Sequence, residues 1–500
     1  MKYKILFLFL FITVFTTSCK DDYLELEPIG RVLETSYYQT EGQIFEALIA
    51  AYDVLQWGGT YGWTMRTGLL NAASDDCFAG GSNQDDQPSW VAYDQFTLNP
   101  LLGPQAGFWR KNYEGIYKAN LVLEKIELVE NISPVFKART IAEAKFLRAY
   151  YHFELLRFFG NVLILDQVLT GDNIYDQVQS PPADVYAFIE QDLNDARNTF
   201  ELPETLVSDN LGRVTKGAVN AFLGKVILYQ NNDARMLEAA GLFEEVINSG
   251  VYALELDYAD IFKSANEFGT ESVFEINYSG NSRGGYGANG LDNFPEGNYD
   301  VQFFGMRGYV GPTFAAGWSF CPVTPKLVEV LTGDPRFEHT IIDGNALKQQ
   351  GASYEVGYQN TDYFVRKYAG LQDEKALDGE PALNWGNNVR DIRLADVLLM
   401  AAECFARAND DASARNYLNQ VRSRVFLPEV TASGSDLLDA IYKERQLELA
   451  TEGHRFFDLV RTGRAAQELD NFVEGKHEIL PLPQREIDVS GGVVVQNPGY

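Results

Sequence analysis

The sequence predicts a mainly α-helical protein with little β structure, a tetratricopeptide-like scaffold of paired helices that carries long loops. Apolar residues recur at helical spacing along much of the chain. Two close helix pairs, 215–249 and 392–424, each have roughly the length of one tetratricopeptide unit, which buries its apolar face by stacking on neighbours. Two segments without periodicity, 71–107 and 279–317, interrupt this pattern and are rich in Gly, Asn and aromatic residues.

The first eighteen residues have the parts of an export signal. Two lysines precede an apolar run over 5–15, and small or polar residues lead to Cys19. The run is shorter than the ~20 apolar residues that cross a bilayer. We therefore expect residues 1–18 to be removed as a lipoprotein signal and Cys19 to be lipidated, anchoring a single domain over 19–500. The alternative is a plain secretory signal, because Thr16 stands where lipoprotein signals usually have Leu.

Helices are expected in order along the chain. Thr40 and Gln43 form a capping box ahead of an apolar helical face, and Ser133-Pro134 opens a helix that stops by Gly160. The remaining expected helices lie around 109–120, 182–198, 215–229, 234–249, 392–408 and 412–424.

The two aperiodic segments are the candidate ligand-binding loops. Aromatic rings beside Asp, Asn and Arg offer flat apolar faces and convergent hydrogen-bonding groups, which suit a polar, ring-shaped ligand such as a sugar. The alternative is that these rings pack the loops onto the helices. Four of the six tryptophans lie in or beside the first loop, 71–107.

Charge and cysteine content exclude several classes of protein. A net charge of −29 and the lack of a basic run argue against nucleic acid as a partner. After Cys19 only three cysteines follow, widely spaced, so a structural zinc site is not expected. No cofactor is expected. A structural Ca²⁺ bound by the Asp- and Asn-rich loops stays open, although no EF-hand spacing is present.

No catalytic constellation is recognised in the sequence. Asp75 and Asp76 are adjacent, so on extended backbone they point to opposite faces and do not suit a glycosidase pair. The four histidines are scattered, with no HExxH motif and no serine elbow. We therefore do not expect an enzyme.

The C-terminal third, 391–500, contains long motifs that resemble a known family. It reads "DIRLADVLLMAAECFARANDDASARNYLNQVRSRV" from 391, "IYKERQLELATEGHRFFDLVRTGR" from 441 and then "ILPLPQREIDVSGGVVVQNPGY". Earlier stretches agree in order, including "AEAKFLRAYYHFELLRFFGNV" from 142. This pattern is similar to the SusD/RagB family of outer-membrane nutrient-binding lipoproteins.

The resemblance implies a lipid-anchored protein of the outer membrane that faces the cell exterior. It would bind an oligosaccharide and pass it to a SusC-like TonB-dependent transporter, without performing a reaction. Two alternatives stay open: a RagB-like protein that binds peptides, and a helical glycoside hydrolase. The regions that supply family sites hold the expected ligand contacts, which are Asp75, Trp90, Tyr93, Tyr286, Phe294, Tyr299 and Arg307.

Other residues of these motifs are interpreted as structural. Trp318 is expected to pack inside the fold. A charged set is expected to form a partly buried ion-pair network that holds helices together, and consists of Arg445, Glu448, Glu452, Arg455, Asp458 and Arg461.

Overall fold

The structure is a computed structural model that describes residues 37–58, 63–286 and 295–500. The expected signal segment 1–18, the expected lipidation site Cys19 and the expected ligand contact Phe294 lie outside these ranges. None of the helices in the described ranges is long and apolar enough to span a bilayer.

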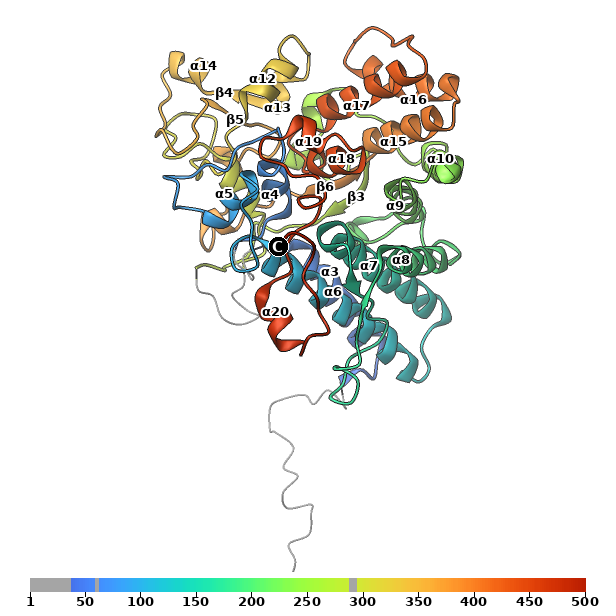
Figure 1. Cartoon of the computed structure of the whole chain (residues 1–500). Coiled ribbons are helices and arrows are strands. Elements are labelled where there is room, and N and C mark those ends of the chain that lie inside the picture. Colours follow the sequence, from blue (N-terminus) through green and yellow to red (C-terminus); the bar gives the residue numbers. More distant parts are fainter. Residues whose placement is uncertain (1–36, 59–62, 287–294) are drawn as a thin grey trace, which may run out of the picture.

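Antiparallel helices make up the N-terminal half of the fold (Figure 1). Neighbours in sequence pack together, α6 on α7, α7 on α8 and α9 on α10. The caps explain where these helices begin: the Thr40 hydroxyl accepts from Gln43 N, the Ser133 hydroxyl from Phe136 N and the Thr215 hydroxyl from Ala218 N. The helices are α3 (Glu41–Asp53), α6 (Gln105–Lys125), α7 (Pro134–Phe159), α8 (Pro182–Arg197), α9 (Lys216–Tyr229) and α10 (Met236–Ile247).

A second group of helices continues the repeat pattern in the C-terminal half. The pair α15 (Leu394–Arg407) and α16 (Asp411–Arg424) is followed by α17 (Ser435–Leu449), which packs on both. Helix α10 packs against α15, so the two expected helix pairs stack directly on each other. The mainly α, tetratricopeptide-like scaffold predicted from the sequence is therefore confirmed.

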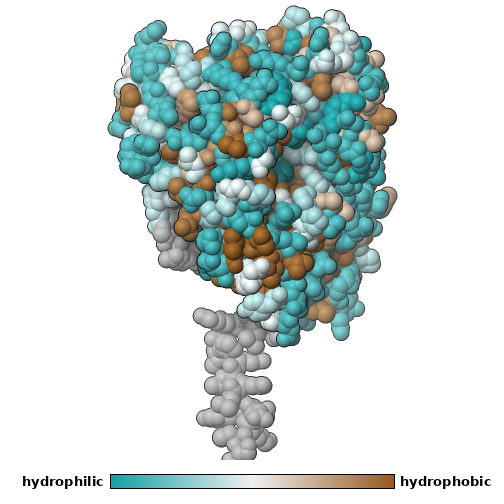
Figure 2. All heavy atoms as spheres, viewed as in Figure 1, coloured by the Kyte–Doolittle hydropathy of each residue, from teal (hydrophilic) through white to brown (hydrophobic). Residues whose placement is uncertain are grey.

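Short helices and strands build the upper left of the molecule in Figure 1, where Figure 2 shows a mostly hydrophilic surface. The last three short helices of the chain lie nearer the centre and in the lower part of Figure 1. Periodicity does not predict these helices, because four to seven residues give too few repeats. The expected loop 71–107 contains α5, and the expected loop 279–317 contains α11. The short helices are α4 (Arg66–Ala72), α5 (Pro88–Asp94), α11 (Tyr299–Phe304), α12 (Pro325–Leu331), α13 (Phe337–Thr340), α14 (Gly344–Gln349), α18 (Arg455–Arg461), α19 (Ala465–Glu468) and α20 (Gln484–Val489).

Strands are few and pair across long stretches of sequence. In the described ranges they form three two-stranded antiparallel sheets. Strand β3 (Ser272–Ile276) pairs with β6 (Val389–Arg393), with Ser272 opposite Arg393. The others are β1 (Val162–Leu163) with β2 (Gln179–Ser180), and β4 (Ile341–Asp343) with β5 (Tyr363–Val365).

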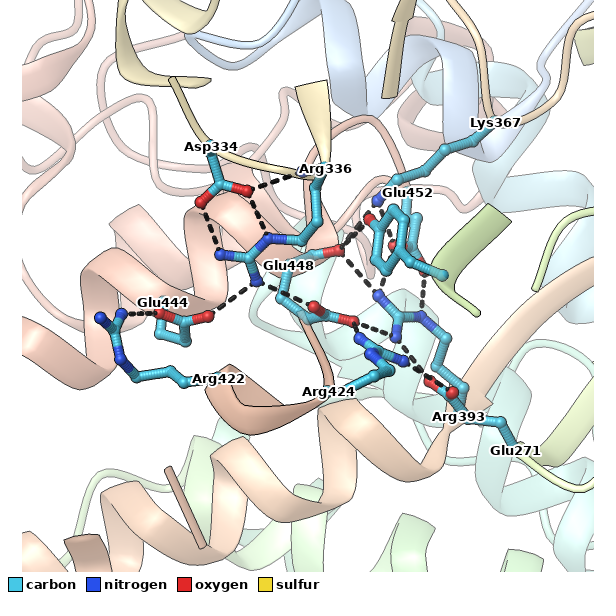
Figure 3. Close-up of polar contacts among 11 residues, drawn as sticks. Glu271, Asp334, Arg336, Lys367, Arg393, Arg422, Arg424, Glu444, Glu448 and Glu452 are labelled. Carbon is cyan, nitrogen blue, oxygen red and sulfur yellow. Dashed lines mark hydrogen bonds and ion pairs between the residues drawn. The ribbon is translucent and has the colours of Figure 1, made fainter. Parts of the chain in front are cut away.

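A buried ion network joins β6 to α16 and α17 (Figure 3). At its centre Arg393 donates to carboxylate oxygens of Glu271, Glu448 and Glu452 at 2.6–2.8 Å. Burial opposes the charge of Glu448, but Arg424, Arg393 and Arg336 outweigh it and hold its pKa well below the ordinary value. Five cations balance five carboxylates in this ion network: Arg336, Lys367, Arg393, Arg422 and Arg424, with Glu271, Asp334, Glu444, Glu448 and Glu452.

The rest of the charged set singled out in the sequence is also buried and paired. Arg445 contacts Asp396 and Asp458, and Arg461 contacts Glu403. The structural interpretation of these charged residues is therefore confirmed.

Candidate ligand-binding site

Aromatic side chains from three separate segments meet at the surface beside α11. The ring of Trp63 lies 6.3 Å from that of Tyr286 and 5.9 Å from that of Trp318, measured between centroids. Tyr286 is 57% exposed, and both tryptophans are half-buried. We call Trp63, Tyr286 and Trp318 the aromatic platform. It presents ring surface to solvent, as a site that stacks against a ligand requires.

A second layer of buried rings supports the aromatic platform. Trp63 contacts Tyr299 and Phe303 with centroid separations of 5.6 and 6.1 Å, and Phe303 also contacts Trp318 at 5.4 Å. Below these, Trp90 packs on Phe303 at 5.3 Å. The platform therefore rests on the core, which limits the side-chain entropy lost when a ligand binds.

Backbone hydrogen bonds fix Trp318 to the end of α11. Trp318 N donates to Gln302 O, Ser319 N to Gly305 O and Phe320 N to Phe303 O, each at 2.8 Å. The two chain segments come so close at Gly305 and Gly317 that a Cβ on Gly317 would lie 2.4 Å from Gly305 Cα. Glycine at both positions allows the approach that places Trp318 beside Trp63.

Two residues at the platform adopt left-handed backbone conformations that non-glycine residues rarely use. Trp63 has φ 60° and Ser319, directly after Trp318, has φ 55°. Such strain is of order 1–3 kcal/mol per residue and clusters at functional sites. The two values indicate that tertiary contacts hold the backbone at both tryptophans in place.

The segment that carries Tyr286 is held by a neighbouring loop. Gly284 O accepts from Asn384 Nδ2 at 2.9 Å and from Glu380 N at 3.0 Å. Partial burial, and then the negative charge of Glu380, raise the pKa of the Tyr286 hydroxyl. The hydroxyl stays protonated near neutral pH and can donate a hydrogen bond to a ligand.

Charged groups flank the platform on the Trp318 side. Arg307 Nη2 donates to Asp86 Oδ2 at 3.0 Å and to Trp318 O at 3.1 Å. Of the contacts expected from the sequence, Tyr286 lies in the platform, Arg307 beside it and Tyr299 beneath it, only 4% exposed.

Three expected contacts lie in the interior instead. Trp90 and Tyr93 are 2% and 0% exposed, and their rings contact Phe303 and Phe456. Asp75 is buried and pairs with Arg455 and Lys326. Their burial removes them from the candidate ligand contacts, because neither a ring face nor a carboxylate is open to a glycan. For Trp90 and Tyr93 the alternative of aromatic packing therefore holds.

The charge state of Asp75 follows from its partners. Burial alone would raise its pKa, but hydrogen bonds from Arg455 and Lys326 hold that pKa below the ordinary value. The adjacent Asp76 is fully buried. These two carboxylates cannot flank a glycosidic bond at the surface.

Trp63 and Trp318 are absent from the contacts expected from the sequence. The packing role expected of Trp318 is supported by its contacts with Phe303 and Phe320, and part of the same ring is also exposed. A usable signal was present: both tryptophans are next to glycine, at Gly62 and Gly317, in segments without helical periodicity. No cluster of metal-ligating side chains occurs in the ranges that the structure describes.

A scaffold of helical repeats that carries an aromatic platform on a layer of buried rings is typical of one class of protein, the ligand-binding repeat proteins. Comparisons with known proteins identify the family within this class. Residues 270–500 match the model of the "SusD family", and residues 22–228 match a model described as "Starch-binding associating with outer membrane". The chain belongs to the SusD family, as its sequence motifs predict.

Solved structures and curated sequences agree along nearly the whole chain. A "Laminarin binding SusD-like protein" is 40% identical, with a TM-score of 0.86, over 93% of this chain and 100% of that one. Surface glycan-binding protein A from Bacteroides thetaiotaomicron in complex with laminarihexaose is 30% identical, with a TM-score of 0.82, over 91% of this chain and 99% of that one. SusD-like protein P25 of Formosa agariphila is 25% identical over 98% of this chain and 97% of its own.

Proposed function

We propose that the protein binds an oligosaccharide of a laminarin-type glucan at the aromatic platform and does not cleave it. The observation that carries the proposal is the surface layer of Trp63, Tyr286 and Trp318 on a supporting layer of buried rings. Aromatic faces stack on sugar rings, and the neighbouring hydroxyl and guanidinium groups suit sugar hydroxyls. The solved structures of 40% and 30% identity are a laminarin-binding SusD-like protein and a surface glycan-binding protein in complex with laminarihexaose.

The angles between the rings support a curved ligand. The plane of Trp63 makes 86° with Trp318 and 59° with Tyr286. Rings at such angles cannot all stack on one flat ribbon of sugars, whereas a chain that curves can present successive faces to them. Laminarin-type glucans curve, and cellulose-type glucans run flat.

The place of this protein in uptake is part of the same proposal. Cys19 would carry the lipid anchor on the outer membrane, with the domain facing the cell exterior, and the bound glucan would pass to a SusC-like TonB-dependent transporter. The leader sequence and the outer-membrane association in the family description support this. Copurification with a SusC-like TonB-dependent transporter from the native outer membrane would test the partner.

Calorimetric titration of the chain without its first nineteen residues tests the ligand. We expect binding to laminari-oligosaccharides, much weaker binding to cello-oligosaccharides of equal length, and unchanged sugar after incubation. Trp318→Ala should abolish or strongly reduce the heat, and Leu256→Ala, at an exposed position remote from α11 in sequence, should not. Heat with peptides alone would replace the proposed ligand by a peptide, and cleavage of the sugar would establish a glycosidase.

A further inference from the structure

We propose that Arg307 is a positioning residue for this site: together with Asp86 it fixes Trp318 in the aromatic platform, and it does not contact the glucan itself. This inference rests on the proposed function. It also changes the role of Arg307, which the sequence suggests is a direct ligand contact.

Two of the three guanidinium nitrogens of Arg307, Nη2 and Nε, face the protein. Its Nη2 bridges Asp86 Oδ2 at 3.0 Å and the carbonyl oxygen of Trp318 at 3.1 Å. The backbone N of Arg307 donates to Ser319 Oγ at 2.8 Å. The Arg307 side chain is only 23% exposed, and its Nε is buried. Arg307 thus donates hydrogen bonds both to the carbonyl of Trp318 and to the hydroxyl of Ser319.

Asp86 extends this hold to a second loop. Besides Arg307, its Oδ2 accepts from Ser82 N at 2.7 Å and from Ser82 Oγ at 2.8 Å. In the same loop Gly81 N donates to Ser319 O at 2.8 Å. The loop that contains Gly81 and Asp86 is therefore joined to the Trp318 segment through backbone hydrogen bonds, which include Gly80 N to Phe320 O at 3.0 Å, and also through Arg307.

The backbone at Trp318 needs such support. Ser319 is held at φ 55°, a conformation that persists only where surrounding contacts enforce it. Backbone hydrogen bonds hold Ser319 at its N and O atoms, whereas the Trp318 carbonyl accepts from the Arg307 guanidinium. Without that guanidinium, the peptide plane between Trp318 and Ser319 can rotate. The Trp318 ring would then leave its near-perpendicular orientation to Trp63, which is 86° between ring planes.

The test is a double-mutant cycle on glucan binding with Arg307→Ala, Asp86→Ala and the double variant. Each single change should weaken binding to a laminari-oligosaccharide roughly threefold to tenfold, because the ion pair is partly exposed. The double variant should bind no worse than the weaker single variant, since both remove the same support. Arg307→Lys should restore part of the affinity, because an ammonium can still reach one acceptor.

Arg235→Ala is the matched control. Arg235 pairs with Glu190 at 2.7 Å and is 25% exposed, close to the 23% of Arg307, but it lies at the start of α10. Its removal should leave binding unchanged. Near-ultraviolet circular dichroism of the Trp63 and Trp318 pair gives a second readout, which should change in Arg307→Ala and not in Arg235→Ala.

Different outcomes overturn different statements. If Arg307→Ala weakens binding while the dichroism stays as in the wild type and Asp86→Ala binds normally, Arg307 contacts the glucan directly and the positioning role is refuted. The role is also refuted if Trp318→Ala loses binding while Arg307→Ala keeps it. If Trp318→Ala itself binds as the wild type does, the proposed site fails instead.

Discussion

Replacing Arg393 with alanine removes the centre of the buried ion network. Arg393 makes five hydrogen bonds: four to carboxylate oxygens of Glu271, Glu448 and Glu452, and one to the backbone oxygen of Glu448. It is 1% exposed. Removing one partner from a buried ion pair costs ~3–5 kcal/mol, because the remaining charges are left without compensation in a medium that solvates them poorly.

The remaining partners set the size of the loss. Glu271 and Glu448 keep Arg424, and Glu452 keeps Lys367. No carboxylate is left alone, so we expect a loss of ~3–5 kcal/mol in the free energy of unfolding and not a multiple of it. Arg393→Met, which keeps most of the side-chain volume, should lose nearly as much, because the charge and not the cavity dominates.

Urea denaturation followed by circular dichroism measures this loss. The melting temperature is a poor readout, since a chain of this length shifts by only about 1 °C per kcal/mol. Arg235→Ala, at a partly exposed ion pair, should cost ~1 kcal/mol or less and serves as the control. A loss in Arg393→Ala as small as that of the control would refute the reasoning, because it would mean that water solvates the ion network.

Three further results are expected. Trp63→Ala and Trp318→Ala should each weaken glucan binding roughly 10–100-fold, ~1.4–2.8 kcal/mol, in the titration described above, and equal affinity in both variants and the wild type would contradict the platform. Asp75→Ala should lower stability by ~3–5 kcal/mol in urea, because it strands buried Arg455, while an unchanged stability would return Asp75 to the surface candidates. Burial, and then the charge of Asp75, raise the pKa of Asp76 to about 7. The free energy of unfolding of the wild type therefore falls as pH rises from about 4, the ordinary pKa of an aspartate, through 7. Asp76→Asn cannot ionise, so its stability relative to the wild type should increase between pH 5 and 8. Parallel stability curves for the two proteins would contradict this assignment.

The long helices could be predicted because their signals are local. Ser133 and Thr215 cap helices where the sequence indicates, since a hydroxyl that accepts from the N–H three residues on needs no tertiary contact. The charged set around Glu448 was likewise predictable as structural, because so many ionisable groups on helices with apolar faces must be paired when buried.

The site was predictable only as a region. Composition distinguishes an aromatic loop from a polar one, but it does not say which face of a ring the core covers. Trp90 and Tyr93 lie on α5, a helix too short to show periodicity, and α5 turns both rings inward. Trp318 keeps part of its ring exposed because Gly305 and Gly317 let two segments approach, and the adjacent Gly317 marks such an approach in the sequence without saying which segment it meets.

The pairing of β3 with β6 has a consequence for the order of folding. Ser272 meets Arg393 only after the whole intervening chain is available, and Arg393 then reaches Glu448 and Glu452 further on. Contacts of such long sequence separation form late and slow the search for the native state. The N-terminal helices can pair as soon as they emerge, whereas the half that holds the ion network must wait for its last helices. A chain stalled before α17 would therefore expose unneutralised arginines, which makes this half the part most dependent on assistance during folding.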